Sequence, residues 1–224
     1  MSKHSTKGTV LVTGASSGIG AALARTFASQ GFALVLTARR ESLLKELHEE
    51  LSPLTDVTYI VSDLASEDGV GTLLREVAAL EISVDVLVNN AGIAYSENFD
   101  LLDDAGIQQL ISLNITALST LTLHFVKEMK HRGSGRILNV ASVAAFQPVP
   151  SMSIYAASKA FVLSLTESLS EELTLKEYQI FSLFIRANGR KINREIILQE
   201  VWKNISVQGK TVDVHLYNLR KKIE

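Results

Sequence analysis

The 224-residue chain contains no cysteine, and this absence excludes disulfide bonds and thiolate metal ligands. No uninterrupted apolar run approaches the roughly 18 residues that a membrane-spanning helix needs. The first nine residues carry lysines but no apolar stretch behind them, so they do not resemble a secretory signal. We therefore expect a cytoplasmic protein with no membrane span and no metal site.

Net charge is also nearly absent, at -2, but this value hides an asymmetry. Residues 1–173 carry a formal charge of -7 and residues 174–224 carry +5. A basic end segment on an acidic body is a hint of polyanion binding. On charge alone, an ordinary solvated basic surface is the favoured interpretation. The hydrophobic content of 46% excludes a disordered chain and predicts a sizeable core.

Short apolar runs alternate with amphipathic stretches through most of the chain. Such alternation predicts an α/β fold whose parallel sheet is covered by helices on both faces. The expected strands are 9–12, 32–36, 57–61, 84–88 and 136–140, and the expected helices are 21–30, 41–51, 69–80, 107–130 and 153–172.

A glycine-rich turn, TGASSGIG at residues 13–20, follows the first expected strand and opens the first expected helix. Gly14 allows a tight turn, and Gly18 lets the backbone approach a pyrophosphate. Gly20 lies at the start of the helix, whose free N–H groups and positive dipole end favour an anion. With Ser16, Ser17 and Ile19, these glycines predict a dinucleotide-binding turn.

Further motifs stand at the ends of the other strands and in the two long helices. They are Asp63 after the third strand, Asn89-Asn90-Ala91-Gly92 after the fourth, Asn114 in a long helix, Ser142 after the fifth strand, and Tyr155-Ala156-Ala157-Ser158-Lys159. With the glycine turn, this set resembles the short-chain dehydrogenase/reductase family over residues 8 to about 172. The resemblance implies a Rossmann-like doubly wound sheet. It also implies hydride transfer to a small carbonyl compound or from a secondary alcohol.

Four residues are the catalytic candidates. Tyr155 and Lys159 are four apart, so they lie on one face of a helix. A lysine ammonium beside a phenol stabilises the phenolate, which suits Tyr155 to general acid/base work. Ser142 can hydrogen-bond the reacting substrate oxygen, and the resemblance implies that Asn114 holds a water relaying protons to Lys159. On its own, a Tyr-x-x-x-Lys pattern is best interpreted as an ordinary surface pair. Because Ser142 and the glycine turn accompany it, a catalytic pair becomes the favoured interpretation.

The end of the second strand predicts the cofactor. Ala38 stands where the family places the carboxylate that binds the ribose 2′-hydroxyl of NAD. Arg39 and Arg40 follow, and a guanidinium suits a 2′-phosphate, so we expect NADP to be preferred over NAD. The alternative is that both arginines simply begin a solvent-facing helix. The resemblance also places Asp63 at the adenine, and Asn90, Ala91 and Gly92 along the ribose region.

After the second long helix the family pattern stops. Its members continue into a sixth strand, a Pro-Gly turn that closes over the nicotinamide, a substrate lid and a seventh strand. This chain has no proline after Pro150 and no glycine between Gly135 and Gly189. We therefore expect a sheet that lacks its last two strands, an open nicotinamide pocket and little turnover.

A different pattern follows. Thr174 with Glu177 three residues on is typical of a capping box at a helix start. Further helices are expected at 194–202 and, with basic character, at 211–223. Three short helices with a basic last one suggest a helix-turn-helix arrangement.

Residues 173–224 resemble the winged-helix effector domain of OmpR/PhoB-type response regulators, without its N-terminal sheet and, since the chain stops at Glu224, without its wing. The resemblance implies that 211–222 is the recognition helix. Residues facing bases would be Asp213, Val214, Tyr217 and Asn218, and residues near phosphates would be Lys210, Thr211, His215 and Arg220. The alternative, that this helix packs on the sheet and binds nothing, stays equally open.

The sequence thus predicts a chimera of an NADP-binding domain, 1–172, and a partial DNA-binding domain, 173–224. Three hypotheses follow. The chain is an NADP-dependent oxidoreductase, a fragment of an OmpR-type DNA-binding transcriptional regulator, or a hybrid that retains dinucleotide binding with little turnover. The missing Pro-Gly turn and wing favour the hybrid. Expected partners are NADP(H), weakly bound duplex DNA and a second copy of the chain, contacted through the two long helices.

Overall fold

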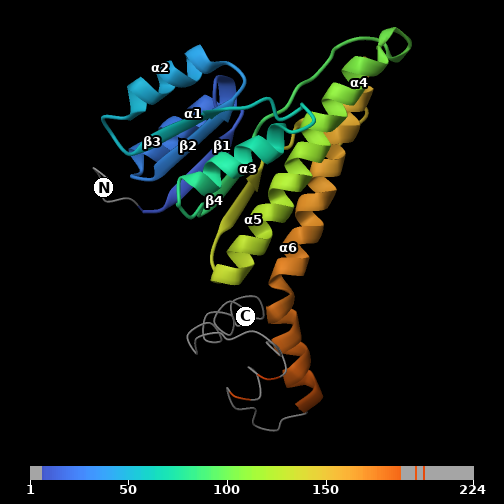
Figure 1. The fold of residues 1–224 in the computed structure, drawn as a ribbon. Helices are drawn as coiled ribbons and strands as arrows, with labels where there is room; N and C mark the ends of the chain where they lie inside the picture. The colour runs from blue at the N-terminus through green and yellow to red at the C-terminus, as the bar shows by residue number, and fades with distance from the viewer. Residues whose placement is uncertain (1–6, 188–194, 196–198, 200–224) are drawn as a thin grey trace. The chain divides into compact units, whose positions relative to one another are not determined.

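The computed structural model describes residues 7–187 together with Glu195 and Gln199. The chain divides into two compact units, Met1–Ser164 and Leu165–Glu224. The first unit contains a five-stranded parallel sheet with the order β3-β2-β1-β4-β5 (Figure 1). The strands are β1 (Thr9–Thr13), β2 (Ala33–Ala38), β3 (Val57–Val61), β4 (Val86–Asn89) and β5 (Arg136–Asn139). This sheet confirms the predicted α/β class.

The strand order reverses between β1 and β4, because β2 and β3 extend the sheet on one side of β1 and β4 and β5 extend it on the other. In doubly wound sheets, ligands bind beyond the carboxyl ends of the strands at such a reversal. The glycine turn follows β1 and the Asn89–Gly92 motif follows β4, so both predicted cofactor segments lie at this point.

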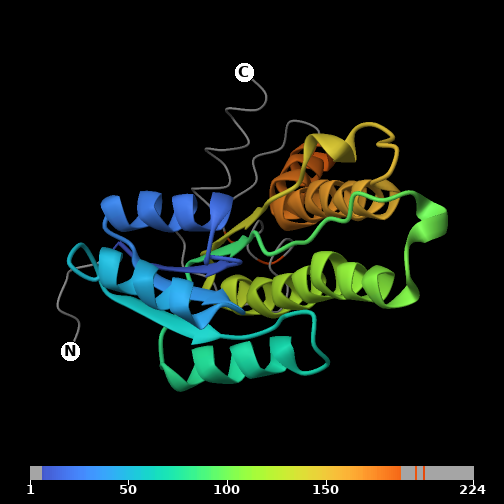
Figure 2. The same cartoon turned by 90° about the horizontal axis from the view of Figure 1, so that it is seen from above.

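Helices cover both faces of the sheet, and two separate clusters of buried residues result (Figure 2). Helices α1 (Gly18–Ser29) and α2 (Glu41–Leu51) bury alanines and leucines against alternate residues of β1 and β2, such as Val10 and Leu34. Helices α3 (Gly69–Ala79) and α5 (Leu118–Arg132) pack on the opposite face, against Leu11 and Val35. Both faces of these strands are therefore buried, which explains their continuous apolar runs.

The long helix expected at 107–130 is not uniform. It consists of α4 (Asp104–Ile111), a π-helical segment η2 (Ser112–Ala117) and α5. Two short 3₁₀ turns, η1 (Phe99–Leu101) and η3 (Val143–Ala145), lie in the loops after β4 and β5. A π-helical turn was not predicted, because hydrophobic spacing does not distinguish it from an α-helix over so few residues.

Helix α6 (Ser153–Ala187) corrects one prediction. The capping-box pattern at Thr174 predicted the start of a new helix, but the backbone is helical without a break from Ser153 through Thr174 to Ala187. No glycine or proline lies in this range, and extending an existing helix avoids a second costly nucleation. The prediction that Thr174 begins a helix is therefore wrong.

The predicted DNA-contact residues, 210–220, lie outside the described residues, as does the expected helix 211–223. Of the expected helix 194–202, only Glu195 and Gln199 are described, and both are helical.

Among the described residues, one helical stretch, Asp104–Arg132, is long and apolar enough to cross a membrane by length and composition. The core helices of soluble proteins pass the same test, and this stretch packs Leu113, Leu121 and Phe125 into the second buried cluster. Its composition alone is thus weak evidence for a membrane span.

Candidate active site

The three glycines of the turn between β1 and α1 are needed for different reasons. Gly14 has a φ of 66°, and a Cβ there would lie 2.8 Å from the Cα of Ala91. A Cβ on Gly20 would collide with the carbonyl oxygen of Gly14. Gly18 has a φ of 56° but nothing within 4 Å of a Cβ position. The turn is therefore packed closely against the segment after β4, and the space at Gly18 is open.

Hydrogen bonds between Thr13 and Asn90 hold that packing. The Thr13 hydroxyl accepts from the backbone N–H groups of Asn90 and Ala91, both at 3.0 Å, and donates to the carbonyl of Val88 at 3.2 Å. The Asn90 side-chain amide donates to the carbonyls of Thr13 and Gly14 at 2.9 and 3.2 Å. Asn90 thus supports the turn itself. Thr13 was missed as a site residue, although it is the first letter of the motif.

The N-terminus of α1 has the features of an anion-binding site. Its N-cap residue, Ser17, makes no side-chain capping bond, and the first turn carries no acidic residue. The guanidinium of Arg40 donates to the Ser17 hydroxyl at 2.7 Å and to the Ser16 hydroxyl at 2.9 and 3.3 Å. A positive charge therefore lies beside free backbone donors, the combination that binds phosphate groups.

Arg39 has a different neighbour. Its Nη1 lies 3.9 Å from an Asp63 carboxylate oxygen, and both side chains are about half exposed. The other Asp63 oxygen accepts from the backbone N–H of Ala65 at 3.0 Å. The fold thus brings Arg39 and Asp63, predicted to contact different parts of the dinucleotide, to one place beyond β2 and β3.

The predicted catalytic pair occupies the first turns of α6. Lys159 Nζ lies 5.8 Å from the centre of the Tyr155 ring and donates a hydrogen bond to the carbonyl of Val140 at 2.7 Å. Lys159 is buried, and this desolvation lowers the pKa of its ammonium group from the usual 10.5.

Asn114 lies in the π-helical segment and joins this pair. Its amide accepts from the N–H of Ile93 and donates to the Ile93 carbonyl, both at 2.9 Å, and also donates to the Ser158 hydroxyl at 3.1 Å. A Cβ on Gly92 would lie 3.3 Å from Asn114 Oδ1 and 3.6 Å from Lys159 Nζ. The structure therefore brings Gly92, Asn114 and Lys159 together. π-Helical turns often occur at functional sites.

Ser142 follows β5 and is the N-cap of η3, where its hydroxyl accepts from the N–H of Ala144 at 3.2 Å. This contact uses an acceptor position and leaves the hydroxyl proton free for another acceptor.

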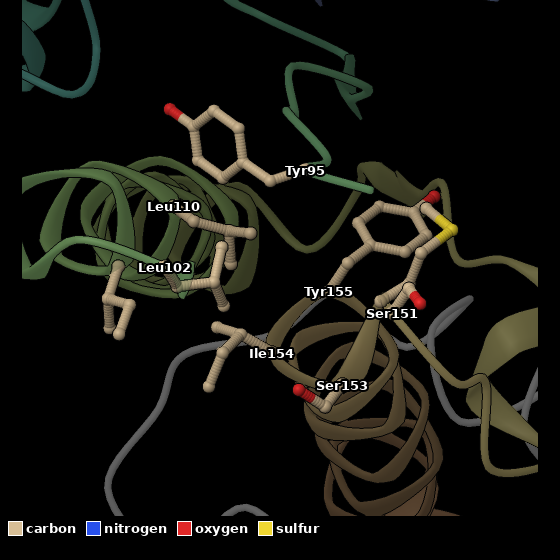
Figure 3. A pocket seen from close by; sticks show the side chains of 9 residues that line it. Tyr95, Leu102, Leu110, Ser151, Ser153, Ile154 and Tyr155 are labelled. Atoms are coloured by element: carbon tan, nitrogen blue, oxygen red, sulfur yellow. The ribbon is translucent and has the colours of Figure 1, made fainter. Parts of the chain in front are cut away.

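A small hollow lies beside Tyr155 (Figure 3). Its volume is about 230 Å³, counted with the open solvent at its mouth. The walls come from the loop after β4, from α4, from the residues just before α6 and from its start, and they include Tyr95, Leu102, Ile107, Leu110 and Ile154. The Tyr95 hydroxyl donates to Gln109 Oε1 at 2.6 Å. Sequence reasoning missed this hollow; the apolar residues after the Asn89–Gly92 motif were its only signal.

The model of the family described as short chain dehydrogenase matches residues 8–185. The chain belongs to this family. A curated relative, sulfoacetaldehyde reductase 2 of Chromohalobacter salexigens, is 40% identical over 169 residues, which cover 73% of this chain and 66% of the relative. The chain spans about two thirds of the length of the first curated relatives that it matches.

Solved structures agree with this assignment. A short-chain dehydrogenase from Sphingobium yanoikuyae in complex with NADPH is 40% identical, with a TM-score of 0.70 over 75% of this chain and 66% of that one. A metagenomic short-chain oxidoreductase in complex with NADP is 34% identical, with a TM-score of 0.71 over 75% and 77% of the chains. These similarities support a nicotinamide dinucleotide as the cofactor.

A second family model, described as transcriptional regulatory protein, C terminal, matches residues 169–224. The two matches overlap at residues 169–185, which lie within α6.

Proposed function

We propose that this chain binds NADP(H) in preference to NAD(H) at the reversal of its strand order. We further propose that Tyr155, Lys159, Ser142 and Asn114 act on a carbonyl compound or secondary alcohol. The observation that carries the proposal is the convergence of Gly92, Asn114 and Lys159 within one small space at the carboxyl edge of the sheet. When bound, the nicotinamide would give or take the hydride.

The residues present fit such a dinucleotide. Open space at Gly18, uncapped N–H groups at the start of α1 and the guanidinium of Arg40 suit a pyrophosphate or a 2′-phosphate. Ala38 supplies no carboxylate for a ribose 2′-hydroxyl, which supports the choice of NADP.

Each catalytic side chain has one task in this proposal. Tyr155 donates its phenolic proton to the carbonyl oxygen during reduction and takes it back during oxidation. The ammonium of Lys159 stabilises the phenolate that remains. The Ser142 hydroxyl donates to the substrate oxygen, and the Asn114 amide, tied to Ile93 and Ser158, positions the segment around Lys159.

We propose that turnover is low. Among the described residues, β5 is the last strand and α6 runs to Ala187, whereas the family resemblance implies a sixth strand after this helix. The chain has no proline after Pro150 to form the turn that would close over the nicotinamide. Water would then reach the reacting atoms more freely than in a closed site.

A second candidate function concerns residues 173–224. The match to the C-terminal transcriptional regulatory model and the charge of +5 favour weak binding of duplex DNA by this segment. The chimera interpretation rests on the same match and on the change of pattern near residue 173.

The experiment is a fluorescence titration of the full chain with NADPH and NADH, followed by single-turnover reduction of a small ketone by wild type and Tyr155→Phe. We expect tighter binding of NADPH, and a slow reduction that Tyr155→Phe lowers by roughly 10²–10⁴-fold. Equal binding of both cofactors would refute the cofactor preference. Reduction that is unaffected by Tyr155→Phe would refute the catalytic assignment.

A further inference from the structure

We propose that the hollow beside Tyr155 receives an apolar, uncharged arm of the carbonyl substrate and rejects arms that carry an anionic group. This inference rests on the proposed function, because it takes Tyr155 as the residue at which the carbonyl reacts. It names the substrate class that the motifs alone leave open.

The side chains that line the hollow offer no counter-charge to an anion. Leu102, Ile107, Leu110 and Ile154 are aliphatic, and the remaining lining consists of two tyrosines, a methionine and two serines, with no charged side chain. An ionised carboxylate or sulfonate placed there would lose water without gaining a counter-charge, which is strongly unfavourable. A phenyl or alkyl group would bury apolar surface instead, which is favourable.

The polar end of Tyr95 is already bonded elsewhere. Its hydroxyl donates to Gln109 at 2.6 Å, and Figure 3 shows this hydroxyl pointing away from Tyr155. Tyr95 therefore presents its ring, not its hydroxyl, to the hollow. Gln109 fixes that orientation from the helix α4.

The chain segment that contains Leu102 is acidic. Glu97, Asp100, Asp103 and Asp104 lie in the eight residues around Leu102, all four are exposed, and residues 97–104 contain no lysine, arginine or histidine. Charges within about 8 Å of one another interact appreciably at physiological salt. The negative charge of this exposed segment would disfavour an anion near Leu102 and would leave a neutral arm unaffected.

Tyr155 connects the hollow to the chemistry. Its side chain lines the hollow together with Leu102 and Leu110, and its hydroxyl points away from Tyr95 (Figure 3). A carbonyl oxygen at that hydroxyl could direct one of its two substituents along the ring into the hollow. Leu102, Ile107 and Ile154 are only partly buried, so their surfaces are accessible to such a substituent.

The test compares two probes of similar shape, 4′-methylacetophenone and 4-acetylbenzoate, which differ by one negative charge. Saturation-transfer NMR would measure their binding to the full chain in the presence of NADP. We expect the neutral probe to bind about tenfold or more tightly than the anion. Equal or tighter binding of 4-acetylbenzoate to the wild type would overturn the proposal.

Two neighbouring leucines provide a matched pair of variants. Leu102→Arg puts a cation into the wall, and Leu101→Arg puts the same cation on a side chain that is 62% exposed and does not line the hollow. We expect Leu102→Arg to abolish or reverse the preference and Leu101→Arg, which changes only the charge of the exposed segment, to lower it much less. The same effect from both variants would contradict the proposal, because the charge of the exposed segment alone would then account for the selectivity.

Failure of the proposed function would look different. Tyr155→Phe keeps the ring, so it should retain the probe preference while turnover is lost. Absence of NADPH binding, with the probe preference intact, would overturn the cofactor assignment and still support the selectivity of the hollow.

Discussion

Arg39 and Arg40 are adjacent in the sequence but have different contacts. Arg40 lies against Ser16 and Ser17 at the start of α1, whereas Arg39 lies 3.9 Å from Asp63. Charge-assisted hydrogen bonds to a phosphate contribute about 1.5–3 kcal/mol each. We therefore predict that Arg40→Ala weakens NADPH binding by roughly tenfold or more and that Arg39→Ala weakens it less. Neither change should weaken NADH binding as strongly as NADPH binding.

Fluorescence titration of both cofactors measures this, with Lys45→Ala as the control. Lys45 is an exposed cation on α2 that pairs with Glu49 at 4.0 Å. A Lys45→Ala effect as large as that of Arg40→Ala would show that general surface charge, not the position of Arg40, determines the affinity.

Lys159 offers a prediction about pH. Desolvation lowers the pKa of its ammonium group below 10.5 in the folded state, so in the window between these two values the unfolded chain binds more protons. The burial penalty is therefore fully present below that window and declines as the pH rises through it. Relative to wild type, Lys159→Met should be most favourable for stability at pH values below the window, and this advantage should shrink as the pH approaches 10.5.

Urea unfolding of both proteins at several pH values measures that trend. The lost hydrogen bond to Val140 offsets the gain by a constant amount, so the slope with pH carries the test. A stability difference that does not change with pH would contradict the prediction.

The gathering of the candidate-site residues was predictable where chemistry restricts the residue type. Gly14, Gly20, Asn114 and Lys159 have narrow requirements of backbone, volume or charge, and the fold brings them to one edge of the sheet. Thr13 and Tyr95 were not predictable, because a threonine at a strand end and a tyrosine in a loop satisfy many roles. Their contacts depend on segments about 77 and 14 residues away.

At the scale of elements, apolar runs and flanking turns located every strand of the sheet to within a few residues. The strands were predictable because both faces are buried, which leaves little choice of residue type. The helix start at Thr174 was not, because a capping pattern is a local signal that an existing helix can override.

This element yields a direct test. Leu175→Pro would fall at the first position of a helix that started after Thr174, where proline is tolerated. Within the continuous helix Ser153–Ala187 it would remove a backbone hydrogen bond and clash with the preceding turn, at a cost of about 3 kcal/mol. We predict a clear loss of far-ultraviolet helical ellipticity, with Leu175→Ala retaining it; unchanged ellipticity in Leu175→Pro would favour the separate helix.

At the scale of the whole molecule, two sequence patterns meet in α6. The short-chain dehydrogenase match ends at residue 185 and the regulatory match begins at residue 169, and the shared stretch 169–185 lies within α6. Each half otherwise keeps its own charge, -7 for residues 1–173 and +5 for residues 174–224.

The charge separation yields a prediction about DNA. The 13 residues 210–222 include the segment that resembles a recognition helix. They contain four cations, Lys210, Arg220, Lys221 and Lys222. If each neutralises one phosphate, the logarithm of the binding constant should fall with the logarithm of salt with a slope of about -4. Affinity for duplex DNA should then be weak and should drop roughly 10²-fold between 50 and 200 mM salt. Binding should show little sequence preference, because Tyr217 and Asn218 offer fewer base-edge hydrogen bonds than arginines.

Fluorescence anisotropy at several salt concentrations measures the slope. Lys221→Glu with Lys222→Glu should make it shallower by about two, since two counterion-releasing contacts are removed. The matched control is Lys127→Glu with Lys130→Glu on α5, which changes the net charge equally but belongs to the first unit. Equal effects from both pairs would mean that overall charge governs binding, through the repulsion that the acidic residues 1–173 already exert on a polyanion. No binding even at 50 mM salt would show that these four cations do not contact DNA.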